Sequence, residues 1–145
     1  MTLDSPQRFI TRIYYAETDA GGVVYHSKYL DLAERGRMEF LRRIGQSVGA
    51  VQAAYGLIFA VRHCDIEYVA PARLEDEIVI ATHLTELGGA SVQFRQVINK
   101  TLDQRLTVLA KLQISLVAIN AAGKPVRIPD GLRAALQNFL EPLAE

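Results

Sequence analysis

The sequence predicts one α+β domain in which an antiparallel sheet buries one long helix. Between residues 27 and 44, apolar side chains recur at helical spacing. From residue 57 to residue 119, alternating apolar and polar residues predict long strands separated by short turns. The chain has 145 residues, of which 50% are hydrophobic, so residues 1–145 can bury a core as a single domain without disulfides.

A strand and two helices come first in the predicted order. The segment RFITRIYY, residues 8–15, nearly alternates and predicts a half-buried strand, which the glycines at 21 and 22 end. A long helix follows from Ser27 to Ile44, with Ser27 able to cap its start and Gly45 its end. A shorter helix runs from Ser47 to Tyr55 and stops at Gly56. The apolar face of the long helix comprises Leu30, Ala33, Arg37, Leu41 and Ile44, with Phe40 beside them.

Strands make up most of the remaining chain. Pro71 divides the stretch from residue 57 to residue 87, and Gly88-Gly89 separates it from SVQFRQVINKTL. A turn at Asp103-Gln104 leads into RLTVLAKLQISLVAI, so the strands predict an antiparallel meander. Residues 120–124 form a turn, and PDGLRAALQNFL predicts a closing helix with Pro129 near its start.

Composition excludes several classes of partner. The 16 basic and 16 acidic residues give a formal charge of +0, so nothing global attracts nucleic acid or an anionic membrane. The single cysteine, Cys64, cannot form an internal disulfide, which favours a reducing compartment. The first residues, with Asp4 and Pro6, resemble neither a signal peptide nor a transmembrane span. We therefore expect a cytoplasmic protein.

One short stretch carries candidate chemistry: ETDAGGVVYHSKY, residues 17–29. Asp19 is ionised near pH 7 and can act as a nucleophile, or as a base if burial raises its pKa. The free N–H groups at the start of the long helix could face a bound carbonyl or its oxyanion. Gly21 and Gly22 lack a Cβ and let a ligand pass close to the backbone. A tight turn capped by Asp19 explains the same residues equally well.

The segment YYAETDAGGVVYHSKYLDLAERGR, residues 14–37, resembles the signature of the 4-hydroxybenzoyl-CoA thioesterase family, and most closely its YbgC-like acyl-CoA thioesterases. FAVRHCDIEYVAPARLEDEIVI and GKPVRIPDGLRAAL resemble the second segment and the tail of that family. The resemblance covers nearly the whole chain. It implies a hotdog fold, with the long helix wrapped by a curved antiparallel sheet of about five strands.

The resemblance also implies roles for individual residues. Asp19 matches the catalytic carboxylate, as nucleophile or as base toward water, and His26 and Tyr15 match positions that assist it. The backbone N–H of His26 matches a donor that polarises the thioester carbonyl in the hydroxybenzoyl branch. We expect the neighbouring loop residues to contact the substrate, with Gly21 and Gly22 giving it room, Val23 and Val24 lining its approach, and Tyr25 beside them.

The function that follows is hydrolysis of an acyl-CoA thioester to a free acid and coenzyme A, without a metal or other cofactor. The family implies a homodimer or homotetramer with active sites shared across the subunit interface. An acyl carrier protein could present the substrate instead of coenzyme A. Two alternatives remain: a non-catalytic hotdog protein that binds acyl thioesters or acyl carriers, and a hydroxyacyl dehydratase.

Other polar residues have simpler explanations. Glu34 lies one turn before Arg37 and could be a helical catalytic carboxylate, but a surface or interface salt bridge is the simpler interpretation. His63 and Cys64 point to opposite faces of a strand, and His83 has no partner at ligand spacing, so no metal site is expected. The candidates for binding the coenzyme A phosphates are Arg62, Arg95, Lys111, Lys124 and Arg127.

Overall fold

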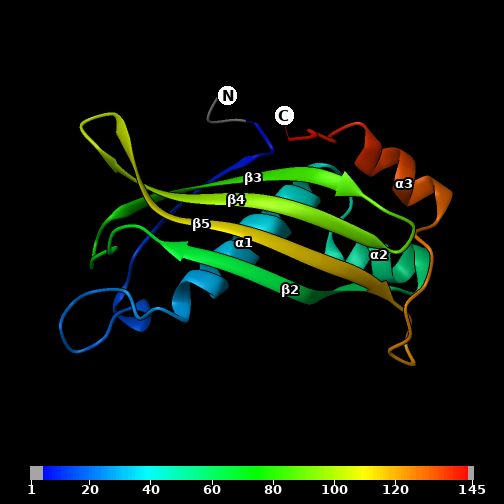
Figure 1. Ribbon diagram of the computed structural model, residues 1–145, viewed down its shortest axis with the longest axis horizontal. Coiled ribbons are helices and arrows are strands. Elements are labelled where there is room, and N and C mark those ends of the chain that lie inside the picture. The colour runs from blue at the N-terminus through cyan, green and yellow to red at the C-terminus, as the bar shows by residue number, and fades with distance from the viewer. Residues whose placement is uncertain (1–4, 144–145) are drawn as a thin grey trace.

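The computed structural model describes residues 5–143, so the first four and last two residues of the predicted domain lie outside the described part. Five strands form one antiparallel sheet in the order β1-β3-β4-β5-β2 (Figure 1). The strands are β1 (Arg8–Arg12), β2 (Ile58–Tyr68), β3 (Glu77–Leu87), β4 (Ser91–Leu102) and β5 (Arg105–Ile119). The helices are η1 (Tyr15–Glu17), α1 (Lys28–Arg43), α2 (Val48–Tyr55) and α3 (Asp130–Gln137), of which η1 is a 3-10 turn.

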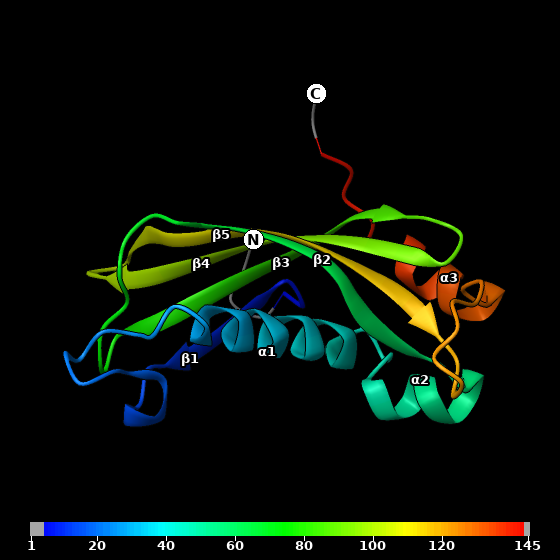
Figure 2. The ribbon, with the colours of Figure 1, turned by 60° about the horizontal axis from the view of Figure 1, so that its bottom comes forward.

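The sheet curves over α1, as Figure 2 shows. Register shifts within β2, β3 and β5 bend these strands, because an extra residue on one strand of an antiparallel pair kinks it. At Gly36 the helix touches the sheet: a Cβ there would lie 2.7 Å from Cγ2 of Ile80. The predicted hotdog arrangement, a long helix wrapped by about five antiparallel strands, is confirmed.

Alternation in β4 was read correctly from the sequence. Val92, Phe94, Gln96 and Ile98 are buried on the side that faces α1, whereas Arg95 is exposed. Phe40 of α1 packs edge-on against Phe94, with ring centroids 5.7 Å apart. Such aromatic pairs add about 0.5–1.5 kcal/mol beyond the area that they bury.

The ends of α1 differ in how well the sequence predicted them. Gly45 follows the helix at φ +80°, and the N–H groups of Gly45 and Gln46 bond the carbonyls of Arg42 and Leu41, which closes the helix as expected. Ser27 precedes the helix but makes no side-chain capping bond, so that prediction is wrong. Leu30 is also misplaced by the periodicity, because it is exposed while Tyr29 is buried.

The predicted meander describes only β3, β4 and β5. β2 does not pair with β3, which follows it in the chain, but with β5. The segment around Pro71 therefore crosses from the β2 edge of the sheet to β3, which lies next to the opposite edge strand β1, and the 11-residue β2 becomes an edge strand. β1 is shorter than predicted, because the chain leaves the sheet after Arg12 and coils into η1.

The helices that follow α1 both lie at one end of the sheet (Figure 1). Ser47 caps α2 by accepting a hydrogen bond from the N–H of Ala50, and Gly56 ends it at φ +66°, as predicted. α3 begins after Pro129 and packs near β3, with Leu132 and Leu136 buried. Within residues 5–143 no helix combines the length and apolar character needed to cross a membrane.

Candidate active site

The loop that contains Asp19 is built by backbone hydrogen bonds between β1 and α1. The N–H of Asp19 donates to the carbonyl of Val23 over 2.9 Å, and Gly22, at φ +79°, donates to the carbonyl of Asp19 over 3.1 Å. Below the loop, the carboxylate of Glu17 is 5% exposed and accepts from the N–H of Tyr14 over 3.0 Å. The loop is therefore a closed, hydrogen-bonded turn that presents its tip to solvent.

The two carboxylate oxygens of Asp19 have different surroundings. Oδ1 accepts a hydrogen bond from the N–H of Gly21 over 2.8 Å, which is the turn-capping contact. Oδ2 receives no hydrogen bond from the described part of the chain. The side chain is exposed, so this second oxygen is open to a water or a substrate.

The start of α1 leaves two backbone donors unused. The first three helical N–H groups, of Lys28, Tyr29 and Leu30, bond the carbonyls of Tyr25, His26 and Ser27. The N–H groups of His26 and Ser27 have no acceptor among residues 5–143. Donors of this kind, at the positive end of a helix dipole, are suited to a carbonyl oxygen that gains negative charge.

The side chains of the three predicted catalytic residues do not form a hydrogen-bonded triad. Tyr15 belongs to η1 and is 82% exposed, and its carbonyl accepts from Thr18. The imidazole of His26 is exposed and makes no hydrogen bond or ion pair with Asp19 in the described residues. One loop thus brings the three residues to the same region but leaves their side chains separate.

Aromatic rings surround His26. Its imidazole lies 4.4 Å from the ring of Tyr25 and 6.4 Å, edge to face, from the ring of Tyr68 at the end of β2. The hydroxyl of Tyr68 donates to the backbone carbonyl of His26 over 3.0 Å. Tyr68 itself packs edge-on against Tyr29, whose hydroxyl accepts from the N–H of Ala72 over 2.9 Å.

The residues predicted to line the approach divide into two groups. Gly21 and Tyr25 are exposed at the loop, and Gly22 and Val23 are half-buried beside them. A Cβ on Gly21 would lie 3.3 Å from Oδ1 of Asp19, so a larger residue would press on the carboxylate. Val24 is 6% exposed and belongs to the hydrophobic core, so its predicted place on the approach is wrong.

A cavity of about 340 Å³ lies away from this loop, between the second half of α1, α2 and the start of β2. Most of its lining is apolar, including Met38, Leu41, Phe59, Val61, Phe94 and Leu116. Arg37 and Glu34 also line it, and Arg37 is only 8% exposed. Desolvation by burial lowers the pKa of Arg37, an effect that Glu34 and Cys64 oppose.

Arg37 is held by a glutamine rather than by a carboxylate. Its Nη1 donates to Oε1 of Gln96 over 3.0 Å, and Nε2 of Gln96 donates to the Ala33 carbonyl and to the hydroxyl of Thr82. No Glu34–Arg37 ion pair within 4.0 Å occurs in the described chain, so the two residues do not form a salt bridge within one subunit. One turn further along α1, Glu39 and Arg42 form an ion pair at 3.5 Å.

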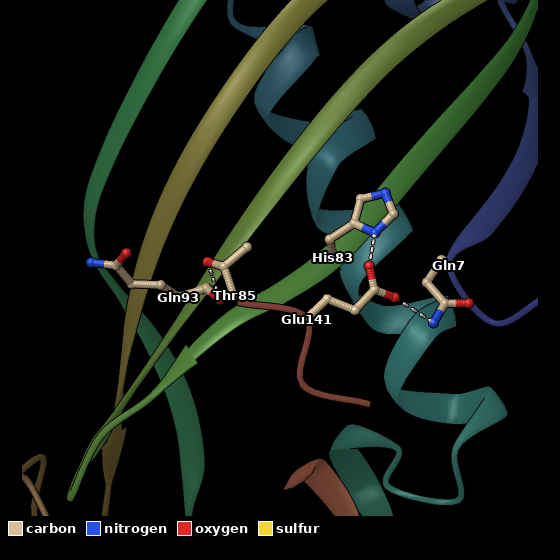
Figure 3. A network of polar contacts seen from close by, with 5 residues as sticks. All are labelled: Gln7, His83, Thr85, Gln93 and Glu141. Atoms are coloured by element: carbon tan, nitrogen blue, oxygen red, sulfur yellow. Dashed lines mark hydrogen bonds and ion pairs between the residues drawn. The ribbon is translucent and has the colours of Figure 1, made fainter. Parts of the chain in front are cut away.

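His83 has a partner that its sequence surroundings did not indicate. Its Nδ1 lies 2.6 Å from Oε2 of Glu141, and Oε1 of the same carboxylate accepts from Gln7 over 3.1 Å (Figure 3). The contacts join β3 to segments near both termini. His83 lies on the face of β3 that points away from α1, because Thr82 and Leu84 on either side of it are buried. These contacts therefore stabilise the segments around Gln7 and Glu141 and do not belong to the Asp19 loop.

Two residues near the site were missed in the sequence. Tyr68 is 42 residues away from His26 in the chain, and Arg73 pairs with Val23 through an isolated β-bridge. For Tyr68, the sequence offered only a weak signal: an aromatic residue at the end of a strand, shortly before Pro71. Among the predicted phosphate ligands, Arg95 and Lys111 extend from strand positions opposite α1 and are exposed.

The chain resembles known proteins over most of its length. The model of the thioesterase-like superfamily matches residues 15–136. The acyl-CoA thioesterase YbgC of Haemophilus influenzae is 34% identical over 138 residues, which are 94% of this chain and 98% of that protein. The acyl-CoA thioester hydrolase YbgC of Escherichia coli O6:H1 is 38% identical over 128 residues, 88% of this chain and 92% of that protein.

A solved structure agrees with these relatives. The probable thioesterase from Bartonella henselae superposes with a TM-score of 0.77 at 37% identity, covering 84% of this chain and 98% of that chain. The family match spans the Asp19 loop, the long helix and the strands β2 to β5 that were described above. This protein belongs to the thioesterase-like superfamily.

Proposed function

We propose that this protein hydrolyses an acyl-CoA thioester to a free carboxylic acid and coenzyme A, with Asp19 as the reacting carboxylate. The observation that carries the proposal is the divided role of Asp19. One oxygen secures the turn through the N–H of Gly21, and the other is free at the surface. The unused N–H groups of His26 and Ser27 follow directly after the same loop. The thioesterase relatives support the same reaction class.

The two donors would hold the thioester oxygen during the reaction. As the carbonyl carbon becomes tetrahedral, its oxygen gains negative charge, and a loss of one such donor typically costs about 100-fold to 1000-fold in rate. Oδ2 of Asp19 can then act in either of two ways. It can attack the carbonyl carbon and expel the coenzyme A thiolate, leaving an anhydride that water cleaves. Alternatively, it can take a proton from a water that attacks the carbon.

The remaining predicted residues have supporting roles in this proposal. Tyr15 and His26 assist Asp19 from the same loop, and the exposed phenol of Tyr15 is free to contact a bound substrate. Gly21, Gly22, Val23 and Tyr25 form the edge along which the thioester approaches. Arg73, which the bridge to Val23 places next to this edge, is the basic residue best placed to meet a coenzyme A phosphate.

We also propose that two copies pair through β2. This edge strand has 11 residues, and its side chains Ile58, Val61 and Tyr68 are exposed in the single subunit. A long edge with exposed apolar side chains is a template for pairing with another strand. An antiparallel pair of β2 strands, related by a two-fold axis, would place the Ile58 end of one strand beside the Tyr68 end of the other.

Such a dimer would join the two halves of the site. The cavity borders Ile58 and Val61, whereas Tyr68 contacts the carbonyl of His26 at the reacting loop. Within one chain the cavity begins several residues into α1, and at 1.5 Å per residue its centre lies about 10–20 Å from the helix start. In the dimer, the acyl group bound to the loop of one subunit could enter the cavity of its partner.

Mixing two inactive variants tests this shared site. Asp19→Asn removes the carboxylate, and Met38→Trp fills the cavity from α1. In a shared-site dimer each mixed dimer keeps one intact site, so random mixing should restore about a quarter of the wild-type activity. No restored activity in a mixture whose mixed dimers are verified by mass would contradict the shared site. Sedimentation velocity of the wild-type chain checks the dimer itself.

Release of free thiol from a panel of acyl-CoA thioesters tests the function. The panel should run from short to medium aliphatic chains and include one benzoyl thioester. Hydrolysis of at least one member, with the acid and coenzyme A in equal amounts, is the expected result. Binding without thiol release would instead support a non-catalytic acyl-thioester protein, and an enoyl product from a hydroxyacyl thioester would support a dehydratase.

A further inference from the structure

The first turn of α1 has one weak backbone hydrogen bond, and a side chain from another part of the fold supports it. The N–H groups of Lys28 and Leu30 bond their carbonyls over 2.9 Å and 3.2 Å, but that of Tyr29 reaches the His26 carbonyl over 3.4 Å. The hydroxyl of Tyr68 donates to this same carbonyl over 3.0 Å. The shorter hydrogen bond on the His26 carbonyl therefore comes from β2, not from the helix.

We propose that Tyr68 is a positioning residue for the thioester carbonyl, because its hydroxyl holds the His26–Ser27 peptide in the orientation that presents the unused N–H of Ser27. The inference rests on the proposed function. Tyr68 does not touch the reacting atoms in this role. It acts through the backbone that the substrate oxygen would contact.

Peptide geometry explains how a hydrogen bond to a carbonyl can aim an N–H group. The carbonyl of His26 and the N–H of Ser27 belong to one planar trans peptide and point in opposite directions. When Tyr68 fixes the carbonyl on one side, the N–H of Ser27 is fixed on the other. Accepting a hydrogen bond at the oxygen also polarises the amide, which strengthens its N–H as a donor.

The surroundings of Tyr68 keep its hydroxyl in place. Its ring packs edge-on against Tyr29, with centroids 5.3 Å apart, and against the ring of His26. Burial raises the pKa of the Tyr68 phenol, and Cys64 and Tyr29 add to the increase. The hydroxyl therefore stays protonated and able to donate at neutral pH. Its place at the end of β2 couples the reacting loop to the proposed dimer edge.

The test removes one hydroxyl from each of two neighbouring tyrosines. Tyr68→Phe keeps the ring and loses only the bond to His26, so we expect kcat to fall about 5-fold to 20-fold, less than the loss of a whole donor. KM and the melting temperature should stay near the wild-type values. Tyr29→Phe is the matched control: it deprives the buried N–H of Ala72 of its acceptor, so its melting temperature should fall while kcat is kept.

The kcat of Tyr68→Phe and NMR resonances of the loop distinguish a failure of this inference from a failure of the proposed function. An unchanged kcat in Tyr68→Phe, when the wild-type chain hydrolyses the thioester, would overturn the role of Tyr68 and leave the proposed function standing. If the wild-type chain hydrolyses nothing on the panel, the proposed function fails. The carbonyl resonance of His26 and the amide resonance of Ser27 then decide by NMR, without substrate: movement in Tyr68→Phe supports the positioning, and unchanged resonances overturn it.

Discussion

The buried contact between Arg37 and Gln96 allows a sharp test of how α1 is seated on the sheet. Gln96 is 0% exposed, and its amide is fully used: Oε1 accepts from Arg37, and Nε2 donates to the Ala33 carbonyl and to Thr82. Because Oε1 must face the Arg37 guanidinium and Nε2 must face the Ala33 carbonyl, these hydrogen bonds fix the orientation of the amide. Arg37 in turn has no carboxylate within ion-pair distance among residues 5–143.

The perturbation is a double-mutant cycle of Arg37→Met and Gln96→Met. Gln96→Met removes one hydrogen bond to a charged group, worth about 1.5–3 kcal/mol, and two neutral ones worth about 1 kcal/mol each, so the free energy of unfolding should fall by about 3–5 kcal/mol. Arg37→Met should cost less, because it also removes a desolvated charge. The double variant should lose less than the sum of the two, with a coupling energy of about 1.5–3 kcal/mol.

The assay is urea unfolding followed by circular dichroism, at one protein concentration because association would add to apparent stability. Gln93→Met is the matched control, since this glutamine is on the same strand but half-buried on the opposite face. Its free energy of unfolding should change by less than about 0.5 kcal/mol. A coupling energy within about 0.5 kcal/mol of zero would refute the buried pair.

Three further predictions concern the loop, the substrate and the thiol. Gly22→Ala places a side chain at φ +79°, so it should lower the free energy of unfolding by about 1–2 kcal/mol and also lower kcat. Gly49→Ala is the control: its Cβ would meet open space, so the free energy of unfolding should stay the same or rise by up to about 1 kcal/mol. Urea unfolding measures both free energies. Arg73→Gln should raise KM for acyl-CoA about 3-fold to 10-fold without changing kcat, because it removes a charged contact to the coenzyme A phosphate. Arg95→Gln is the control and should leave KM and kcat unchanged. An equal change of KM in the two variants would argue against Arg73. Burial raises the pKa of Cys64, helped by Asp65 and opposed by Arg37, so iodoacetamide should react more slowly with the folded protein than with free cysteine at pH 8, and an equal rate would contradict the burial.

Local patterns predicted the elements of the fold well. Alternation located the buried face of β4 although Val97 interrupts it, and the turn residues Asp103 and Gln104, both at positive φ, bounded β5 at Arg105. Helical spacing even placed Arg37 on the buried face, despite its charge. The same spacing failed at Leu30, because the helix begins by turning Tyr29 inward to meet Ala72.

Contacts between distant segments could not be read in the same way. The pairing of β2 with β5 depends on where the chain crosses the sheet after Tyr68, and no local pattern encodes that crossing. The bond from Tyr68 to the His26 carbonyl follows from this placement. The signature segment identified Asp19, but the division of labour between its two oxygens required the geometry of the turn.

The measurement that most directly tests the central claim is thiol release by Asp19→Asn. Asparagine keeps an oxygen that can accept from the N–H of Gly21, so the turn and the melting temperature should be preserved. Asp31→Asn is the control, because it neutralises another carboxylate near the start of α1, one that pairs with Lys28 at the surface. We predict that Asp19→Asn lowers kcat by about 100-fold or more while Asp31→Asn does not. Turnover by a folded Asp19→Asn variant within a few-fold of the wild-type rate would contradict the assignment.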